Sequence, residues 1–573
     1  MEEEQEHEKE ENLEDRNDED PKVTRTRKLT LFLRIHWRGL VCLISPLILL
    51  PVLSPFPPEK SQWCAYTLLV MAIFWVTECI PLPVTSFIPV IVFPMAGVMD
   101  TRHCCRCYIN DTVFMFFGSM VLACAVEQSG LHKRLALFTI RLIGYSHYRL
   151  LFAMSFTTMF VSMWITNTAA TTMMVPINFA LLSVFEEQNL LEIYELDDTG
   201  EQVASDITTC YFCAVSFSAT IGGIGTLVGT ATNLVFKGLF QKAFPAAPEY
   251  LSFPKLSAFS IPYMFAMEIC LYLALVIGYL GFLRPKSKDA ILANISESGK
   301  LAAKNAVHEN WRNLGRITFW EIMVVILFGG AMVMFFCRSP QIFVGWGDII
   351  SDYFELHNNR YARDSAAAML VGFLMMLLPS TLEIFKNCTA KVDELPNRPV
   401  RSVLNWSLMN EQMPYSFMFL LGGGIALSEA AKKEYSDLNG EIGKILRNLN
   451  GLPVAFILLL IIIFTVFVTN FASNVAVCNV VAPIAMQLAK EIKFHPLWFN
   501  IAAGFAASYC FCLPVGTPGN LVVQSAASIP TVKMIKAGIV PSITTVLLTW
   551  LCTYYWAPVV WPDLHSADHE WIH

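Results

Sequence analysis

The sequence predicts an all-α, polytopic membrane protein whose two halves repeat one design. Of its 573 residues, 55% are hydrophobic and only 15% are charged, whereas soluble domains carry about 25% charged residues. An uncharged segment contains Ile165-Thr166-Asn167-Thr168, and a similar motif, Ala472-Ser473-Asn474-Val475, occurs in the second half. Each asparagine is followed nine residues later by a proline, Pro176 or Pro483. The composition indicates a membrane body, and the repeated motif indicates that the two halves are related.

Two further pairs of landmarks occur in the same order in both halves. Downstream of the motifs lie Gly229-Thr-Ala-Thr-Asn233 and Gly516-Thr-Pro-Gly-Asn520, and upstream lie the phenylalanine-containing segments 114–118 and 417–424. Paired polar or Gly/Pro-interrupted segments in corresponding halves are a sequence sign of a transporter's substrate site. For one motif alone, close packing of helices through small residues is the alternative. The duplicated set predicts a ligand site that both halves build.

The N-terminal segment is strongly acidic. Residues 1–21 hold twelve acidic and two basic residues, which is −10 against a formal net charge of −7 for the whole chain, and the remainder sums to +3. We expect residues 1–34 to form a disordered tail, because so charged a segment buries no core. The basic residues that follow, before the first apolar segment, place this tail in the cytoplasm. The remainder carries no basic excess that would indicate a nucleic-acid partner.

About eleven segments are apolar and long enough, at about 20 residues each, to cross a bilayer. They lie at 39–57, 62–80, 83–99, 112–129, 207–245, 256–283, 319–337, 364–380, 413–430, 497–526 and 534–560. The segments 150–184 and 452–489 are too long for one span and carry the polar motifs midway. Two helical arms that meet at a buried tip, a re-entrant hairpin, suit these two segments better.

The distribution of basic residues predicts the orientation. The loop 284–318 holds seven basic residues and is expected in the cytoplasm. An odd number of spans then places the C-terminal tail, 563–573, outside the cell. The basic segment 432–449 disagrees with this assignment, and an interfacial amphipathic helix would explain it. Asn110 is the one glycosylation sequon expected outside, and it lies close to the membrane.

The repeated motifs favour an anion as the ligand, because the hairpins and their companion segments contain no charged side chain. A carboxylate only accepts hydrogen bonds, and the motifs supply donors; these are Thr166, Asn167, Thr168, Ser473 and Asn474. Helix N-termini at the tips add N–H groups and positive dipole ends. Carbonyl oxygens at helix C-termini are ligands for Na⁺, so coupling ions are expected beside the anion, with no other cofactor.

Other chemistry is weakly supported. Glu78 precedes Pro81 and is assigned a structural role at a helix end, while Glu268 is open to a proton or substrate role. The histidines are scattered and show no catalytic or metal-binding motif, so neither an enzyme nor a metal site is expected. Most of the 16 cysteines lie in apolar runs and are interpreted as reduced. The cluster His103-Cys104-Cys105-Arg106-Cys107 is open to metal binding, acylation or neither.

At these motifs the chain resembles the divalent anion/sodium symporter family of solute carrier 13 type, most closely its insect INDY branch. The resemblance extends from about residue 35 to 562. It rests on Thr77-Glu-Cys-Ile-Pro-Leu82, Leu131-His-Lys-Arg134, Ser162-Met-Trp-Ile-Thr-Asn-Thr168, Met173-Met-Val-Pro-Ile177, Gly229-Thr-Ala-Thr-Asn-Leu-Val235, Ser473-Asn-Val-Ala-Val-Cys-Asn479 and Leu513-Pro-Val-Gly-Thr-Pro518.

The resemblance implies a homodimer in membrane lipid, with inverted repeats and an elevator mechanism. Scaffold helices would occupy 35–145 and 319–450, and the transport domain 146–283 and 451–562. The substrate site would comprise Thr166, Asn167, Thr168, Ala231, Ser473, Asn474, Val475, Thr517 and Pro518. One sodium site would use Ser162, Thr166, Asn167 and Gly229, and the other Thr469, Ser473, Asn474 and Gly516.

Some residues depart from the family's pattern. Thr166 replaces a usual serine, Val475 lacks the hydroxyl of bacterial relatives, and Asn470 stands where a glutamate is common. The position of Ala231 is often occupied by glycine in members that prefer citrate, and Thr232 and Gly519 stand where the family usually has prolines. These departures bear on sodium dependence and on the choice between citrate and dicarboxylates.

The sequence thus predicts a secondary active carrier of Krebs-cycle di- and tricarboxylates, such as succinate and citrate, in the plasma membrane. Transport would be either sodium-coupled or a sodium-independent exchange. The alternatives are a sulfate carrier of the same fold, an anion channel and, as the weakest, a membrane enzyme.

Overall fold

The computed structural model describes most of the chain. The described residues are 21–187, 191–196, 202–282, 297–340, 343–355, 361–383, 387–388, 391, 395, 399–413, 415–446, 452–514, 516–565 and 571. The expected disorder of residues 1–20, and most of the expected C-terminal tail, lie outside them.

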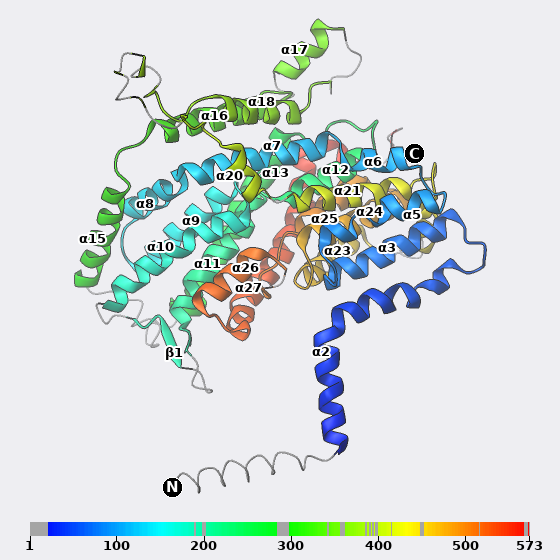
Figure 1. Cartoon of the computed structure of the whole chain (residues 1–573), viewed down its shortest axis with the longest axis horizontal. Helices are drawn as coiled ribbons and strands as arrows, with labels where there is room; N and C mark the ends of the chain where they lie inside the picture. Colours follow the sequence, from blue (N-terminus) through cyan, green and yellow to red (C-terminus); the bar gives the residue numbers. More distant parts are fainter. Residues whose placement is uncertain are drawn as a thin grey trace.

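The first half contains helices joined by short connections, with one small hairpin (Figure 1). Its helices and strands are α2 (Pro21–Ile48), η1 (Leu50–Leu53), α3 (Lys60–Thr77), α4 (Leu82–Thr85), α5 (Ile88–Met95), α6 (Thr101–Tyr108), α7 (Asp111–Ser129), α8 (Leu131–Ile143), α9 (His147–Ser162), α10 (Asn167–Glu187), β1 (Tyr194–Leu196), β2 (Gln202–Ala204), α11 (Asp206–Gly223), α12 (Ala231–Ala243) and α13 (Phe253–Tyr279).

The described part of the second half is helical apart from an isolated bridge between Pro379 and Ser402. Its helices are α15 (Glu297–Asn313), α16 (Phe319–Phe336), α17 (Trp346–Tyr353), α18 (Asp364–Leu377), α20 (Trp406–Gln412), α21 (Ser416–Ala430), α22 (Leu438–Leu446), α23 (Val454–Thr469), α24 (Asn474–Glu491), α25 (Pro496–Ala506), α26 (Pro518–Ala527), α27 (Thr531–Leu551), η4 (Cys552–Trp556), α28 (Ala557–Val560) and η5 (Pro562–His565).

Both segments that carry the repeated motif are helix–break–helix units. The helices α9 and α10 are interrupted at 163–166, and α23 and α24 at 470–473. The expected spans 207–245 and 497–526 are likewise divided, into α11 with α12 and α25 with α26. All four interruptions fall at the polar or Gly-rich motifs. The prediction of two helical arms on either side of each motif is therefore confirmed at the level of the helices.

Several expected elements differ. The expected spans 83–99 and 364–380 are too short to cross as straight helices: the apolar helices there cover Leu82–Met95 and Asp364–Leu377, 14 residues each, or about 21 Å against a hydrocarbon core of about 30 Å. In 83–99, the prolines lack the N–H groups that a continuous helix needs. Residues 21–34, expected to be disordered, belong to α2, since Lys, Arg and Leu favour helix. A two-stranded hairpin, β1–β2, interrupts the otherwise helical chain.

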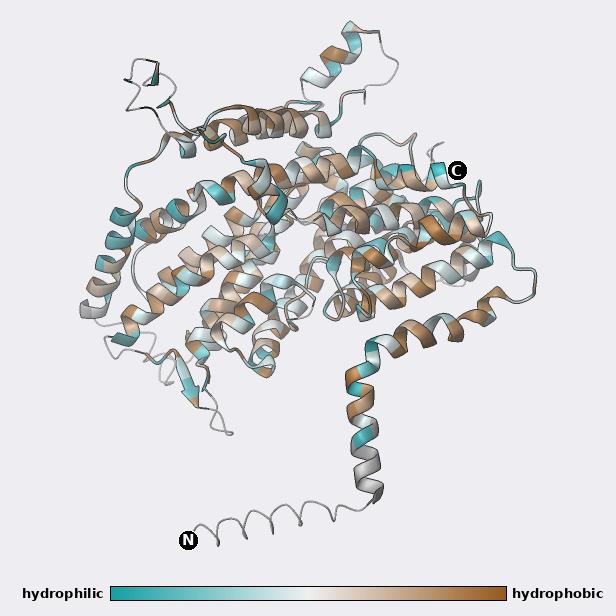
Figure 2. Ribbon diagram, viewed as in Figure 1, coloured by the Kyte–Doolittle hydropathy of each residue, from teal (hydrophilic) through white to brown (hydrophobic). Residues whose placement is uncertain are grey.

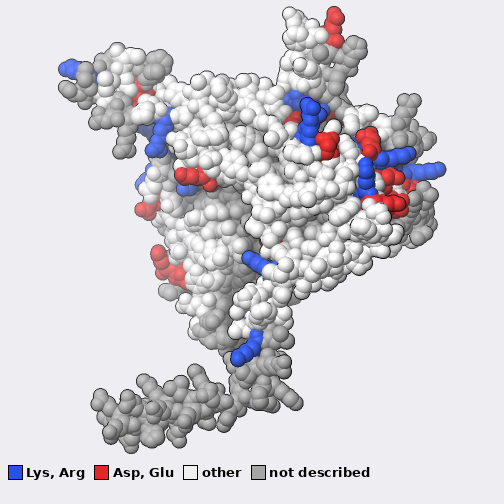
Figure 3. Space-filling view, turned by 45° about the vertical axis from the view of Figure 1, so that its right-hand side comes forward, with Lys and Arg blue, Asp and Glu red and all other residues white. Residues whose placement is uncertain are grey.

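The composition of the helices fits a membrane body. Six helices in the described residues are long and apolar enough to cross a bilayer, judged by length and composition. Hydrophobic residues occur along most of the helices (Figure 2), and many large apolar side chains are exposed. On the face shown in Figure 3, charged side chains gather toward the margins around a broad area without them. This is the pattern expected of a lipid-facing belt.

The two halves pack into each other. The helices α10 and α11 contact α26, while α12 contacts α24 and α25. A separate group consists of α7, α16 and α18, which contact one another and lie along one edge in Figure 1. Asn110 begins α7: its Oδ1 accepts from the N–H groups of Thr112 and Val113, and its Nδ2 donates to Cys107 O at 2.8 Å. The sequon asparagine therefore serves as a helix cap.

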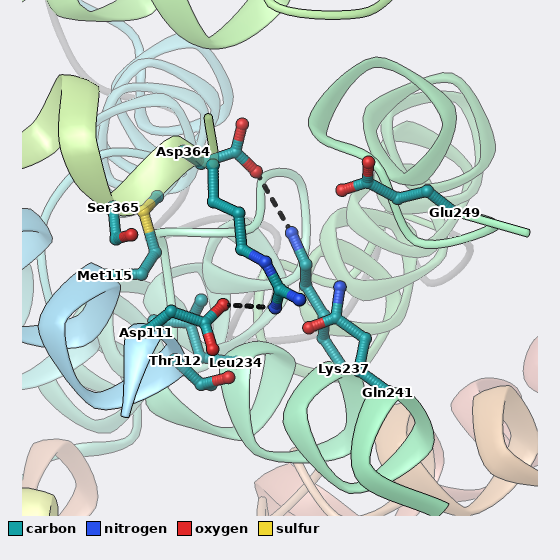
Figure 4. Close-up of a pocket in the computed structure, with 10 residues that line it drawn as sticks. Asp111, Thr112, Met115, Leu234, Lys237, Gln241, Glu249, Asp364 and Ser365 are labelled. Atoms are coloured by element: carbon teal, nitrogen blue, oxygen red, sulfur yellow. Dashed lines mark hydrogen bonds and ion pairs between the residues drawn. The ribbon is translucent and has the colours of Figure 1, made fainter. Parts of the chain in front are cut away.

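A buried charge cluster ties α12 to α16 and α18. Lys237 points toward Asp364 (Figure 4), with 3.1 Å between Nζ and Oδ2, and Arg338 Nε lies 2.5 Å from Asp364 Oδ1. Arg338 also contacts Glu249, with 2.5 Å between Nη2 and Oε1. The side chains of Lys237, Asp364 and Arg338 are at most 8% exposed. Because Asp364 is shared by two buried cations, its carboxylate is the centre of the cluster.

We expect Asp364→Asn to destabilise the protein strongly, since it leaves two buried cations without their shared counter-ion. Removing one partner of a buried ion pair costs about 3–5 kcal/mol. The matched control is Asp111→Asn, which breaks the Asp111–Arg363 pair at the same corner; those side chains are 40% and 39% exposed, and such pairs contribute about 1 kcal/mol or less. Thermal unfolding in detergent compares them, and equal losses in the two variants would contradict the expectation.

Candidate functional site

The two motif asparagines occupy equivalent positions in the two halves. Ser162 Oγ lies 2.9 Å from Asn167 Oδ1 and 2.7 Å from Ala219 O. In the second half, Thr469 Oγ1 lies 2.8 Å from Asn474 Oδ1 and 2.7 Å from Ala507 O. Each trio brings three oxygen atoms together with a single hydroxyl hydrogen among them. Both trios are therefore rich in acceptors, and a cation would satisfy the surplus.

The companion segments are also held in the same way in both halves. Asn233 Nδ2 donates to Gly223 O at 3.2 Å and to Thr226 O at 2.7 Å. Asn520 Nδ2 donates to Cys510 O at 3.0 Å and to Leu513 O at 3.1 Å. These bonds satisfy carbonyl groups that have no partner within the interrupted helices. A helix break inside an apolar body requires such partners for its backbone groups. The repeated asparagines therefore hold the breaks closed.

Gly229 and Gly516 lie where carbonyl oxygens converge. A Cβ on Gly229 would be 2.5 Å from Gly223 O, 2.9 Å from Met163 O and 3.0 Å from Ser162 O. A Cβ on Gly516 would be 2.3 Å from Thr469 O and 3.2 Å from Asn470 O. These carbonyls belong to the C-terminal ends of α9, α11 and α23. Only glycine permits so close an approach, and the oxygen atoms are suited to a hard cation such as Na⁺.

A cavity of about 660 Å³ lies between the two motifs. All nine residues predicted to bind substrate line it, namely Thr166, Asn167, Thr168, Ala231, Ser473, Asn474, Val475, Thr517 and Pro518. Gly229 and Gly516, which are predicted to bind sodium, also line the cavity. Ser162 and Thr469 are buried, do not line it, and form hydrogen bonds to Asn167 and Asn474. The structure thus brings every predicted substrate residue to one space, with the predicted sodium residues beside it.

Four helix N-termini meet at this cavity. They belong to α10, α12, α24 and α26, and the first residues of each line the space. The residues that precede three of these helices, Thr230, Ser473 and Thr517, make no side-chain capping bond, so their hydroxyl groups are free of that role. The Thr232 hydroxyl also lines the cavity and is buried without a hydrogen-bond partner in the described structure. Helix N-termini and open donors favour an anion.

Asn470, beside the second predicted sodium site, makes hydrogen bonds within its own half. Its Nδ2 donates to Val466 O at 2.7 Å, and its Oδ1 accepts from Cys512 N at 3.1 Å. The Asn470 side chain is thus committed to the two backbone segments that flank the break. Its backbone carbonyl still faces Gly516, so the local oxygen cluster does not depend on a glutamate.

Two acidic side chains line the cavity as well. Glu78, at the C-terminus of α3, has a left-handed backbone with φ of 48°, and Glu127 lies near the C-terminus of α7. Among the described residues that line the cavity, there is no lysine, arginine or histidine. From the sequence, Glu78 was expected to have a structural role, and Glu127 was not among the candidate residues. Both residues lie on helices that are far from the motifs along the chain. An acid inside the apolar run of α7 was the signal that could have identified Glu127.

Glu268 does not line the cavity. It is buried on α13 and accepts a 2.7 Å hydrogen bond from Ser218 on α11, so the structure gives it a packing partner away from the motifs. In the cysteine cluster, the backbone N–H and the ring of His103 bond Asp100, and Cys105 is exposed. No group of three potential ligand side chains suited to a metal ion occurs among the described residues.

Known proteins resemble the chain over most of its length. The family model described as the sodium:sulfate symporter transmembrane region matches residues 34–562. Protein I'm not dead yet of Drosophila melanogaster is 38% identical over 556 residues, covering 95% of this chain and 92% of that protein. The Na(+)/citrate cotransporter of Rattus norvegicus is 31% identical over 565 residues, covering 92% and 97%. The sodium-dependent low-affinity dicarboxylate transporter 1 of Caenorhabditis elegans is 30% identical over 578 residues, covering 95% and 94%.

These matches confirm the resemblance that the motifs indicated. They agree with the apolar helices in making the chain a multi-pass membrane protein, and they associate it with transporters and not with enzymes. Because the family model covers the whole membrane body, the chain belongs to the sodium:sulfate symporter family, the divalent anion/sodium symporters.

Proposed function

We propose that the protein is a secondary active carrier that moves di- and tricarboxylates, such as succinate and citrate, across the plasma membrane together with sodium ions. The observation that carries this proposal is the cavity at which four helix N-termini meet without a basic side chain. The names of relatives that transport citrate and dicarboxylates with Na⁺ support the same assignment.

The geometry favours a ligand with two separated carboxylates. Asn167 and its neighbouring hydroxyls lie at one tip, and Asn474 with Ser473 at the other, both on the same cavity. Each tip offers amide or hydroxyl donors, and the helix N-termini add backbone N–H groups. A dicarboxylate would place one carboxylate at each tip. The cavity of about 660 Å³ leaves room for the carbon chain between them.

Sodium coupling follows from the charges. The lining side chains that the structure describes include two acids, Glu78 and Glu127, and no base. A dianion in this space would face only like charges, apart from the helix dipoles, unless cations entered with it. The oxygen clusters around Gly229 and Gly516 offer sites for such cations directly beside the tips. We therefore favour sodium symport over sodium-independent exchange.

For the movement, we propose an elevator mechanism in a homodimer. The segments 146–283 and 451–562 would travel as one body, which is supported by the contacts of α10 and α11 with α26 and of α12 with α24 and α25. The helices in 35–145 and 319–450 would form the fixed scaffold. The N-terminus would be cytoplasmic and the C-terminus extracellular, as the basic loop 284–318 favours.

A sulfate carrier of the same fold is the second candidate, because the description of the matching family model names sulfate. Sulfate is compact and would reach only one tip at a time, so we favour carboxylates. Competition between sulfate and labelled succinate separates the two. An anion channel would instead give currents far faster than the turnover of a carrier.

Asn167→Ala and Asn474→Ala are each expected to weaken succinate binding about 10- to 150-fold, because a hydrogen bond to a charged group contributes about 1.5–3 kcal/mol. The measurement is uptake of labelled succinate at equal surface expression. Asn410→Ala is the matched control, since Asn410 is exposed on α20 and does not line the cavity. Normal uptake by either tip variant would rule out the site that uses both tips.

Replacing external sodium by choline is expected to abolish uptake of succinate and citrate by the wild-type protein. Choline is too large for the carbonyl clusters, so the anion would face Glu78 and Glu127 without compensation. Uptake that continues unchanged in choline would show that the carrier works without sodium. That result would overturn sodium symport and leave the proposed anion site intact.

Gly516→Ala and Gly229→Ala are expected to raise the sodium concentration needed for half-maximal uptake at least about tenfold, or to abolish uptake. The added methyl groups would lie 2.3 Å from Thr469 O and 2.5 Å from Gly223 O, where the cation is expected. Gly278→Ala is the control, because a Cβ there meets nothing within 4 Å. A sodium dependence like that of the wild type in both variants would argue against these cation sites.

A further inference from the structure

A second cavity adjoins the first. It has a volume of about 660 Å³ and is lined by side chains of α7, α8, α10 and α15 and of the residue after α15. Glu127 and Thr172 line both cavities, so the two spaces meet at these side chains. On α10, residues one turn apart continue the wall from the first cavity into the second, beginning with Thr168 and Thr172 and continuing through Pro176 to Ala180. Glu127 therefore stands at the junction.

The charged groups around this junction are unevenly placed. Glu127 lies two residues before the end of α7, whose C-terminal dipole adds to its negative charge. Lys133 on α8 lines the second cavity but not the first. Glu78, the other acid of the first cavity, has an electrostatic partner in Arg38 on α2. Of the two acids that line the first cavity, Glu127 is thus the one that also lines the second, where Lys133 is the basic residue among the described lining side chains.

Resting on the carboxylate carrier proposed above, we propose that Glu127 determines which anion charge the protein accepts: its carboxylate disfavours trianions relative to dianions at the junction of the two cavities. The donors at the tips attract any carboxylate and do not discriminate between ligands of different charge. A fixed negative charge on the same cavity does, because its repulsion grows with each additional negative charge on the ligand. Dicarboxylates therefore pass Glu127 more readily than fully ionised tricarboxylates.

The size of the effect follows from Coulomb's law. For unit charges about 8 Å apart, with an effective dielectric constant of about 20 to 40, one additional negative charge changes a binding constant about 5- to 30-fold. Neutralising Glu127 should therefore improve citrate relative to succinate by about that factor. This discrimination requires the negative charge of the Glu127 side chain, whereas the shape of the side chain is secondary.

The test compares succinate and citrate clearance, the initial uptake rate per substrate concentration, at pH 8 in saturating sodium. The variants are Glu127→Gln, which keeps the shape and removes the charge, and Glu127→Asp, which keeps the charge. Glu187→Gln is the control for a change of net charge, because Glu187 is exposed at the end of α10 and lines neither cavity. We expect the citrate-to-succinate ratio to rise about 5- to 30-fold in Glu127→Gln only.

Binding to purified protein, followed by thermal shift with succinate or citrate, gives the same ratio if Glu127→Gln does not transport. A ratio within twofold of wild type in Glu127→Gln, or an equal rise in Glu187→Gln, would overturn the role of Glu127 while leaving the carrier function intact. A wild-type protein that takes up and binds neither carboxylate would overturn the proposed function, and this inference with it.

Discussion

The rest of the structure depends on one constraint: four helices end and four begin inside an apolar body, where every open backbone group must find a partner. The ends of α9, α11 and α23 direct carbonyl oxygens toward Gly229 or Gly516, whereas α10, α12, α24 and α26 begin at the cavity. Each break therefore places carbonyl acceptors at the end of one helix and N–H donors at the start of the next, so that acceptors and donors lie in different places. This arrangement would give the proposed carrier adjoining sites for cations and an anion without a basic side chain among the described residues that line the cavity.

Amide side chains make this arrangement stable. Asn233 and Asn520 satisfy the carbonyls of the two breaks between companion helices, and Asn470 bridges the second tip to Cys512. An asparagine offers two donors and one acceptor without a charge, so it can close a break that water cannot reach. The departure at Asn470 is thus compatible with an intact cation cluster, because the cluster consists of backbone oxygens.

The site is also connected to the charge cluster through Lys237, at the middle of α12. Ala231 begins this helix at the cavity, and six residues later Lys237 contacts Asp364 on α18. Any displacement of α12 relative to α18 must separate these two charges. Since both are buried, the separated state must provide new partners or water. The position of the first companion helix, and hence of its N-terminus at the cavity, is coupled to α18 by this one carboxylate.

The sequence identified the motif residues because their signal is local: a polar run within an apolar segment, repeated with a glycine and an asparagine at matching positions. Helix breaks, tips and shared lining were therefore predictable. The short α4 and α5 were missed because hydropathy does not register the hydrogen bonds that prolines remove. Glu127 was missed because its position at the cavity depends on how α7 packs against α10 and α12, which no local pattern encodes.

In the proposed carrier, the charge balance would link anion binding and cation binding into one equilibrium. The lining contributes two negative charges from Glu78 and Glu127, and a dicarboxylate adds two more. Helix N-termini carry only about half a unit of positive charge each, and this falls off within a turn. Cations at the Gly229 and Gly516 clusters would offset the remainder, so each ion would raise the affinity for the other by the same factor. In such a site, coupling would not need a separate moving part: it would follow from placing helix N-termini and carbonyl oxygens around one space that two acids share.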